Sequence, residues 1–424
     1  PRLHLFPMSA RHATPETTIL DPRRRWLLIA AMAGSLAMIM IDMTIVAVAL
    51  PAIGDEFGLG ETSLQWVINA YVLVLASTVA LGGRLGDILG KRTAFLLGVS
   101  IFGLASLLCG LAPTGEWLIV SRVVQAIGAV LMQPASAAIV LSASPPEARG
   151  KTMAIYVGVP LLFMSLGPIV GGVITETVGW RWNLYLNVPI AVVIIAMTLW
   201  VRPSNARGSE RRIDPLATVL LLLSLPLLVG GIQQSAAWGF LDGKTLACVG
   251  GGLLGAVFFL WRQRVVATPT LHLELFRDRA FFACAALLFV MQFSMAGGLI
   301  QLSLFAQDVL GYEPLEAGLS ILPLMIPVLF VVHVAGRAYD RSGVRRSAVI
   351  GAVGSALGLA IMGAGIFLET YWVIAVGMVA LGGSSAFVTM PANTEALARV
   401  GLERRAQASG LMQTARQLGA TLGI

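Results

Sequence analysis

The stretch GRLGDILGKR (residues 83–92) returns as GRAYDRSGVR (residues 336–345), and both fit the pattern G-R-x-x-D-x-x-G-x-R. The two copies lie 253 residues apart, and each joins the end of one apolar segment to the start of the next. The first apolar segment begins near residue 26, and another begins near 281, close to the position that the same offset predicts. The sequence therefore predicts two halves of the same orientation. That architecture is typical of transporters, with a site between the halves near the middle of the bilayer.

The composition is that of a membrane protein. Of the 424 residues, 57% are apolar and 12% are charged, whereas soluble globular proteins carry about 45–50% and about 25%. A bilayer-spanning helix needs about 20 apolar residues. We expect twelve spans, at 26–50, 63–83, 93–112, 116–141, 151–174, 183–201, 216–234, 245–262, 281–307, 316–335, 347–367 and 371–392, and a thirteenth from about 406. The fold class is thus an all-α membrane protein, which excludes a soluble enzyme, a disulfide scaffold and a disordered chain.

The basic residues between the spans predict the orientation. With the N-terminus in the cytoplasm, 25 of the 29 Lys and Arg residues fall on the cytoplasmic side. The outer loops carry only Arg181 and Lys244, and Arg122 and Arg416 fall within spans. Cytoplasmic loops of membrane proteins carry such an excess of Lys and Arg. The net charge of +7 therefore reflects topology rather than a nucleic-acid surface.

The repeat also predicts how the chain is divided. We expect a cytoplasmic tail at 1–25, a six-helix half at 26–201, a cytoplasmic linker with two inserted helices at 202–262, and a second half at 263–424. The offset of 253 residues places the end of the second half beyond Ile424. We therefore expect a parent with fourteen spans, of which this chain ends within the thirteenth.

Several further motifs carry a resemblance to a known family. They are DMTIVAVALP at 42–51, RVVQAIG at 122–128, GPIVGG at 167–172, WRWNLYLNVP at 180–189 and GLMQTARQLG at 410–419. Together with the repeated loop they resemble the major facilitator superfamily, specifically its fourteen-helix drug–proton antiporter branch. That branch usually has Asn where this chain has Ala47, so we expect one polar group fewer near Asp42. It usually has Gly where this chain has Ala126, which predicts a looser backbone contact there.

Asp42 lies inside the first expected span, and Arg122 lies inside the fourth. A charge at the bilayer centre costs at least about 2.5–3.5 kcal/mol, so its presence indicates a function. The resemblance implies that Asp42 carries the proton and that Arg122, which cannot deprotonate, is a fixed charge that tunes proton loading. The alternatives are a neutral Asp42 that packs helices and an Arg122 that binds carbonyls or reaches the interface. Contact between the two is not readable from the sequence.

Two groups of residues are expected to control closure. In the fifth span, Pro168 removes a backbone hydrogen bond and small residues permit close helix approach, and the resemblance implies gating there; tight packing alone is the alternative. The four positions of this motif are Gly167, Pro168, Gly171 and Gly172. The repeated loops are interpreted as short turns whose aspartates cap the next helix, or as latches between the halves. Their key residues are Gly83, Asp87, Gly336 and Asp340.

Polar and aromatic side chains at membrane depth are candidates for substrate binding. They are Asn69, Tyr71, Gln125, Gln292, Gln301 and Phe293. A mostly apolar cavity with few polar anchors suits amphipathic ligands, and a cation can rest on an aromatic face. For any one of these residues, helix packing is the alternative.

The sequence as a whole predicts a proton-coupled exporter of hydrophobic or amphipathic, often cationic, compounds. The alternatives are an exporter of one metabolite or antibiotic, and a membrane sensor or scaffold that transports nothing. The sequence carries no P-loop, no H-E-x-x-H motif and no G-x-S-x-G motif, so we expect no enzyme, no cofactor and no metal site. The expected partners are a small amphipathic molecule, protons and the lipid bilayer, for a monomer in the cytoplasmic membrane.

Overall fold

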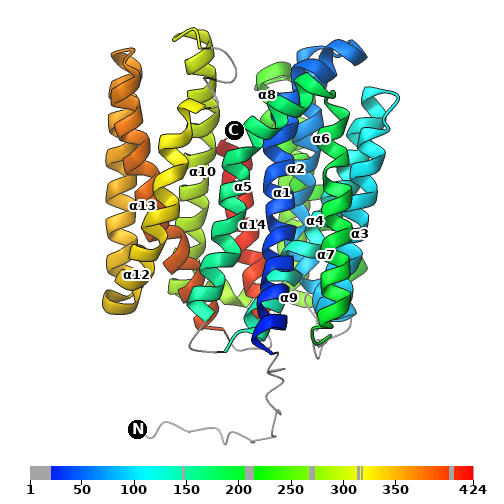
Figure 1. Ribbon diagram of the computed structural model, residues 1–424, viewed down its shortest axis with the longest axis vertical. Coiled ribbons are helices and arrows are strands. Elements are labelled where there is room, and N and C mark those ends of the chain that lie inside the picture. Colours follow the sequence, from blue (N-terminus) through cyan, green and yellow to red (C-terminus); the bar gives the residue numbers. More distant parts are fainter. Residues whose placement is uncertain are drawn as a thin grey trace, which may run out of the picture.

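The computed structural model describes residues 21–145, 149–205, 214–266, 273–312, 316, 319–400 and 405–423. Throughout these residues the regular elements are helices, and they stand side by side in one bundle (Figure 1). Within the described part, nine helices are long and apolar enough to cross a membrane, or up to twelve if each of three bent helix pairs is one span. This agrees in number and order with the twelve spans expected from the sequence.

The first half of the bundle contains the helices up to residue 201. They are α1 (Pro22–Phe57), α2 (Glu61–Leu89), α3 (Lys91–Gly110), α4 (Gly115–Ala143), α5 (Arg149–Thr177), the short α6 (Arg181–Tyr185) and α7 (Asn187–Val201). The sixth expected span is thus divided into α6 and α7.

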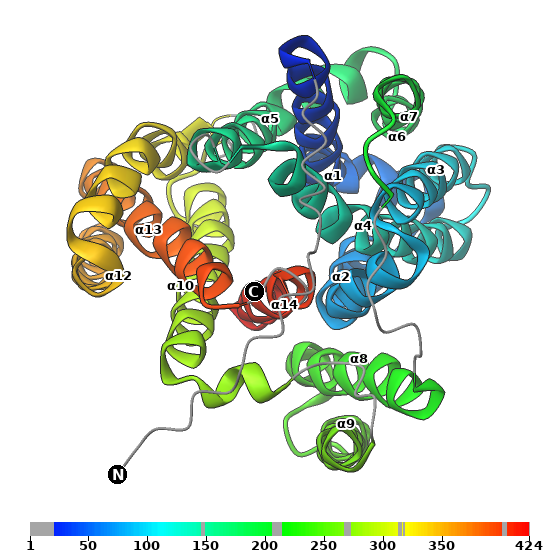
Figure 2. The same cartoon turned by 90° about the horizontal axis from the view of Figure 1, so that it is seen from below.

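Two helices follow before the second half begins. They are α8 (Pro215–Trp238) and α9 (Gly243–Val265), which pack on each other and touch the first half through α2. Seen from below, they lie at the edge of the bundle (Figure 2). That these two helices are an insert between two halves stays a prediction.

The second half contains the helices after residue 273. They are the 3-10 turn η2 (Leu273–Arg277), α10 (Arg279–Asp308), α12 (Leu322–Phe367), α13 (Tyr371–Ala398) and α14 (Arg405–Gly423). α12 unites the tenth and eleventh expected spans across a kink at Gly343. α14 lies between the halves, where it packs against α10 on one side and α2 on the other (Figure 2). On the far side of the bundle, α12 touches α5.

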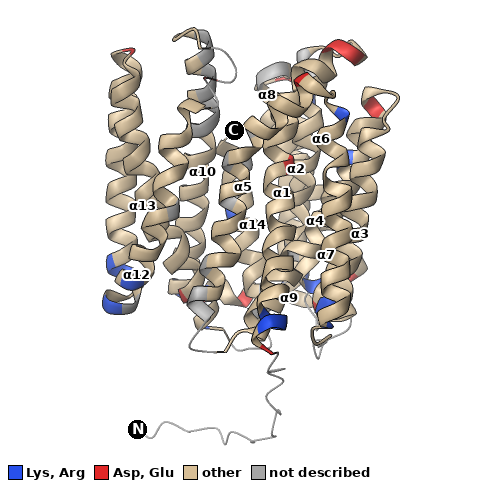
Figure 3. Ribbon diagram, in the orientation of Figure 1, with Lys and Arg blue, Asp and Glu red and all other residues tan. Residues whose placement is uncertain are grey.

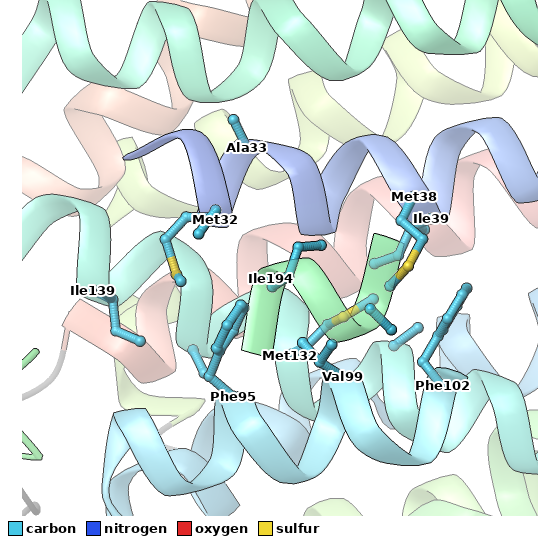
Figure 4. Packing of buried hydrophobic residues seen from close by; sticks show 14 of the residues in the cluster. Met32, Ala33, Met38, Ile39, Phe95, Val99, Phe102, Met132, Ile139 and Ile194 are labelled. Atoms are coloured by element: carbon cyan, nitrogen blue, oxygen red, sulfur yellow. The ribbon is translucent and has the colours of Figure 1, made fainter. Parts of the chain in front are cut away.

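The core of the first half lies where α1, α3, α4 and α7 meet. Phe95, Val99 and Phe102 of α3 point toward Met132 of α4 and Ile194 of α7 (Figure 4). Lipid tails are as apolar as these side chains, so close packing rather than the hydrophobic effect holds membrane helices together. The shape of this core therefore matters more than its hydrophobicity.

Glycines set the closest of these helix contacts. A Cβ at Gly98 would lie 2.6 Å from the backbone nitrogen of Met132, and a Cβ at Gly128 would lie 2.5 Å from that of Phe102. The second half repeats the device 253 residues later, since a Cβ at Gly351 would lie 2.6 Å from the Val388 side chain. The repeat read from two loops thus extends to the packing of the helices that follow them.

The repeated loops themselves are turns at a glycine, as expected, but in the first loop the aspartate does not cap the next helix. Gly90 (φ 93°) and Gly343 (φ 73°), which occupy equivalent positions, both have the positive φ that favours glycine. Asp87, however, lies in the last turn of α2, and α3 begins after Gly90 without a side-chain cap. The expectation that Asp87 caps a helix start is therefore wrong. Asp340 lies within α12, and its side chain is outside the described residues.

Charged residues gather near the ends of the bundle. The end from which the N-terminal segment leaves carries most of the Lys and Arg, and acidic residues mark the opposite end of several helices (Figure 3). The apolar middle of the bundle separates the two.

Candidate functional site

Four described helices bring polar side chains together inside the first half. Asp42 of α1 is 1% exposed and Arg122 of α4 is 0% exposed. The Arg122 Nη1 donates to Asp42 Oδ2 at 2.5 Å, which forms a fully buried ion pair. The two residues that the sequence singled out separately therefore form one site.

The other carboxylate oxygen of Asp42 accepts two amide hydrogen bonds. Gln125 Nε2 donates to Oδ1 at 2.9 Å, and Asn187 Nδ2 donates to the same oxygen at 2.8 Å. Ser106 Oγ of α3 accepts from both amides, at 3.3 Å and 3.0 Å. A buried carboxylate needs this number of donors, because each unmade hydrogen bond in a low-dielectric interior is costly.

Arg122 is held from three directions besides Asp42. Its Nη1 donates to Gln125 Oε1 at 2.7 Å, and its Nε donates to the backbone oxygen of Val67 at 3.2 Å. Its guanidinium carbon lies 4.3 Å from the centre of the Tyr71 ring, a cation–π distance. Arg122 Nη2 has no hydrogen-bond partner within the described residues. The alternatives of interfacial snorkelling and of carbonyl binding alone do not fit this geometry.

Asn187 and Ser106 belong to this cluster but were not singled out from the sequence. Asn187 was part of the WRWNLYLNVP motif, and the signal available was a lone amide at the start of an apolar helix. The segment before it is anchored by Arg181, whose Nη1 pairs with Glu56 and whose Nη2 donates to the backbone oxygen of Ala112 at 3.0 Å. Anchors to α1 and to the end of α3 thus fix where α7 starts, and so where Asn187 points.

Ala47 lies on an exposed face of α1, whereas Asp42 is buried. The amides that donate to Asp42 come from α4 and α7. The expectation that Ala47 removes a polar group near Asp42 stays a prediction. Ala126 is fully buried, and its neighbour Gly128 makes a close backbone contact with α3.

The gating motif in α5 packs directly behind the Asp42 site. A Cβ at Gly167 would overlap Thr44 Oγ1, two residues after Asp42, and a Cβ at Gly171 would lie 3.1 Å from Ile45 Cα. Gly172 leaves more room, since its nearest neighbour would be Val48 at 3.9 Å. α5 bends by 43° between Ile155–Met164 and Ile169–Thr177. Pro168 lies at this bend, and its side chain is outside the described residues.

The candidate substrate residues divide into two groups. Tyr71 and Gln125 are 0% exposed within the Asp42 cluster, so in this conformation they support the ion pair rather than line an open cavity. Asn69 and Gln292 are half-buried in α2 and α10, and Phe293 is 45% exposed. The Gln301 side chain is outside the described residues. No hydrogen bond found among the described residues joins Asn69 or Gln292 to the cluster.

The latch residues lie near the end of α2 and just before the kink of α12. Gly83 is buried within α2, and a Cβ at Gly336 in α12 would lie 3.3 Å from the Met390 side chain of α13. Asp87 is 6% exposed.

One crevice of about 150 Å³ lies in the second half, between Met291 of α10, Ser355 of α12 and Val388 of α13.

No group of three or more His, Cys, Asp or Glu side chains that could hold a metal ion occurs in the described part of the chain. The carboxyl group of Asp42 can gain and lose a proton, and it can make and break its ion pair with Arg122.

Comparison with known proteins gives a consistent result. The profile of the family described as the Major Facilitator Superfamily matches residues 32–424. The multidrug resistance protein Stp of Mycobacterium tuberculosis is 33% identical over 406 residues, which cover 95% of this chain and 75% of that protein. The tetracenomycin C resistance and export protein of Streptomyces glaucescens is 30% identical, with 94% and 74% covered. The puromycin resistance protein pur8 of Streptomyces alboniger is 30% identical, with 95% and 81% covered.

Solved structures of the same fold include two transporters. The human organic anion transporter MFSD10 superimposes with a TM-score of 0.67 at 16% identity, covering 95% of this chain and 92% of that chain. The proton:xylose symporter XylE superimposes with a TM-score of 0.64 at 16% identity, covering 94% and 87%. At this identity the likeness concerns the fold.

Proposed function

The chain belongs to the Major Facilitator Superfamily, and from that premise we propose that it exports hydrophobic or amphipathic compounds from the cytoplasm in exchange for protons. It is a multi-pass membrane transporter and not an enzyme. We further propose that the compounds move outward, that protons are the coupling ion, that the protein lies in the cytoplasmic membrane, and that its N-terminus is in the cytoplasm. The distribution of Lys and Arg supports this orientation.

The observation that carries the proposal is the buried ion pair of Asp42 and Arg122. Breaking such a pair by removing one charge is costly, because the remaining charge is left buried. Protonation of Asp42 removes one of the two charges and therefore weakens the pair. Arg122 then keeps Gln125 and the Val67 carbonyl but loses its anion. The protonation state of one carboxyl group is thus linked to how firmly α1 is tied to α4.

The packing behind the site supports a route from proton to conformation. Asp42 and Thr44 lie on α1, and Thr44 fits into the space left by Gly167 of α5. α5 in turn touches α12 of the second half. In the proposed cycle, uptake of an external proton loosens α1 from α4 and moves α1 with α5 against the second half. Release of the proton to the cytoplasm restores the pair, as alternating access requires.

We include the two repeated loops in this proposal as cytoplasmic latches. Gly83 with Asp87, and Gly336 with Asp340, close the end of the bundle that carries most of the Lys and Arg. We also propose that the chain belongs to the fourteen-helix drug–proton antiporter branch and that it works as a monomer. The residues proposed to contact the substrate on its path are Asn69, Tyr71, Gln125, Gln292, Gln301 and Phe293.

A second candidate function is the export of one particular metabolite or antibiotic. The observation that favours it is that relatives such as the tetracenomycin C and puromycin resistance proteins carry the name of a single compound. A panel of substrates separates the two, because a narrow exporter responds to one chemical series only. A sensor or scaffold without transport is a third candidate, and it has no need of a buried ion pair.

The test uses everted membrane vesicles that contain this protein and hold an imposed proton gradient. The readout is proton release on addition of each member of a panel of lipophilic cations, anions and neutral amphiphiles. We expect wild type to release protons with several compounds and Asp42→Asn with none. Asp242→Asn removes a carboxylate at the start of α9, where Asn also caps well, and serves as the matched control. A response of Asp42→Asn equal to wild type contradicts the role of Asp42, and silence of wild type with every compound contradicts multidrug export.

A further inference from the structure

A second buried polar cluster lies outside the Asp42 site, where the first half meets α14. Tyr156 of α5 is 4% exposed, and its hydroxyl lies 2.7 Å from Ser136 Oγ of α4, which is 0% exposed. The same hydroxyl donates to the backbone oxygen of Gln133 at 3.5 Å. Arg416 of α14 lies within electrostatic range of the Tyr156 phenol. Three helices, two from one half and one from the other, thus contribute to one polar spot.

Two polar atoms of this cluster lack partners. Gln133 is 7% exposed, and its Oε1 is buried without a hydrogen-bond partner in the described structure. The buried Nε of Arg416 also lacks one. Most buried polar groups in proteins are hydrogen-bonded, so each exception needs an explanation such as an absent ligand. Here an acceptor and a donor are left over at the same interface.

Arg416 also brings a positive charge to this cluster of polar groups. Arg416 stands eleven residues after the first residue of α14, which at 1.5 Å per residue is about half of the hydrocarbon thickness of about 30 Å. A charge at this depth is expensive and is normally paired. No ion pair observed among the described residues involves Arg416. The residue as a whole is partly exposed, whereas its Nε is buried.

We infer that this cluster binds the anionic end of an amphipathic substrate, a carboxylate or phenolate, with Arg416 as its cation. Gln133 Oε1 then accepts a hydrogen bond from a hydroxyl or N–H next to that anionic group. Guanidinium binds a carboxylate through two parallel hydrogen bonds, which gives both affinity and orientation. The inference rests on the proposed export and narrows its substrate class. It replaces the expectation of cationic substrates by that of anionic or zwitterionic ones.

The two clusters then have separate tasks. Asp42 holds its own arginine inside the first half and is fully buried, whereas Arg416 stands on the helix that packs against both α2 and α10. The first cluster binds the proton, and the second binds the substrate anion. A site between the halves is exposed to one side at a time as they move.

The experiment measures binding rather than transport, so that it does not depend on the export test. The probes are 1-pyrenebutyrate, its uncharged methyl ester and the cationic 1-pyrenebutyl-trimethylammonium, which share one apolar body. The protein is placed in nanodiscs of phosphatidylcholine, and affinity is read from pyrene fluorescence. The variants are Arg416→Gln, which removes the charge, and Arg416→Lys, which keeps the charge but cannot form the two parallel hydrogen bonds of a guanidinium. Arg264→Gln removes an exposed charge in the last turn of α9 and is the control.

We expect wild type to prefer the carboxylate over the ester by about tenfold to a hundredfold, as a charge-assisted hydrogen-bonded pair provides. Arg416→Gln is expected to lose this preference while it binds the ester as wild type does, and Arg416→Lys to keep part of it. Unchanged ester binding also shows that the variants are folded. Arg264→Gln is expected to behave as wild type.

Three outcomes overturn the inference. They are an unchanged preference in Arg416→Gln, stronger binding of the cationic probe by wild type, and no binding of the carboxylate. Displacement of the probe by added phosphatidylglycerol, in wild type but not in Arg416→Gln, assigns the site to a lipid headgroup and also overturns it. If the preference depends on Arg416 while Asp42→Asn still exports, the proton proposal fails and the anion site stands.

Discussion

The two halves of the bundle carry opposite chemistry at the same repeat position. In the first half Asp42, Arg122 and Gln125 form the buried hydrogen-bonded site. The residues 253 positions later are Met295, Ala375 and Met378. They lie together too, since Ala375 and Met378 belong to one buried cluster and Met295 packs against it.

This difference separates the packing that the two halves share from the charges that only the first half has. Both halves keep the glycine turn and the glycine-packed helix pair, but only the first keeps the charges. Methionine is flexible and polarisable and adapts to irregular surfaces. The repeat thus retains one packing scheme and gives the ionisable group to one half and an adaptable apolar interior to the other.

The largest effect is expected when the charged residues of the first half are replaced by their apolar counterparts from the second half. Arg122→Ala alone leaves the Asp42 carboxylate buried without its cation and is expected to cost about 3–5 kcal/mol of stability. The triple variant Asp42→Met, Arg122→Ala and Gln125→Met is expected to regain most of that loss but to release no protons with substrate. Thermal unfolding in detergent, followed with a thiol-reactive dye, checks this because Cys109 and Cys284 are buried.

A triple variant that unfolds as easily as Arg122→Ala would contradict the view that the charges serve function rather than stability. Asp42→Met with Gln125→Met, which retains Arg122 without its anion, is the control for the number of substitutions.

The glycine-packed pairs provide the next largest effect and test what the halves share. Gly98→Ala and Gly351→Ala are both expected to destabilise, by about 1–3 kcal/mol, through overpacking. The Gly98 variant should lose more, because its Cβ would lie 2.6 Å from the Met132 backbone nitrogen, whereas the nearest backbone atom to a Cβ at Gly351 is the Ser384 oxygen, at 2.9 Å. Gly250→Ala and Gly363→Ala, where a Cβ meets open space, are the controls. The same unfolding measurement applies. An equal or reversed order of the two losses would contradict this difference in packing, and no loss in either variant would contradict the shared close contact.

Asn187 tests how much the amides contribute to the charged half. Asn187→Ala removes one of the two amide donors on Asp42 Oδ1, and a hydrogen bond to a charged group contributes about 1.5–3 kcal/mol. We expect lower thermal stability and a changed pH dependence of substrate-induced proton release. Asn393→Ala in the second half is expected to change neither, because among the described residues its amide bonds only the Thr389 carbonyl of its own helix. A wild-type pH profile in Asn187→Ala would refute the role of the amide.

The smallest effect is expected between the halves, at the linker helices. Asp214 caps α8, and its carboxylate accepts from Arg262 Nε of α9 at 2.8 Å. The hydrogen bond from Arg262 holds the pKa of Asp214 below its usual value. A lowered pKa in the folded state stabilises the protein above the unfolded pKa of about 3.9, and that stability is lost as the pH falls through the lowered folded value.

Asp214→Asn should therefore cost about 1 kcal/mol or less at pH 7, since a partly exposed pair contributes little. The difference from wild type should shrink toward zero in strong acid, which unfolding measured across the pH range would show. A difference that grows on acidification would contradict the sign of this shift.

Much of this molecule is predictable from its sequence, because a bilayer imposes length and hydropathy on every span. The number of spans, the two inserted helices and the glycine turns follow from those constraints and from one repeated loop. Asp42 and Arg122 are predictable as well, since an intramembrane charge is conspicuous.

The remaining features depend on distances that a sequence does not contain. Contact between Asp42 and Arg122 depends on how α1 packs against α4, and the place of Asn187 depends on the anchored segment before α7. The error at Asp87 has the same origin. The motif marks a turn, but whether an aspartate lies before or after the turn depends on where α2 ends, and α2 continues to Leu89.

The paired turns at Gly90 and Gly343 have a consequence for mutational tolerance. Both positions have a positive φ that L side chains rarely adopt, whatever the space around them. In a library that samples all substitutions at every position, we expect low fitness at both positions, 253 codons apart, and again at the positive-φ pair Gly58 and Gly311, which has the same spacing. The interval between them would reveal the ancestral duplication from survival data alone, even where the two halves no longer share the residues that do the chemistry.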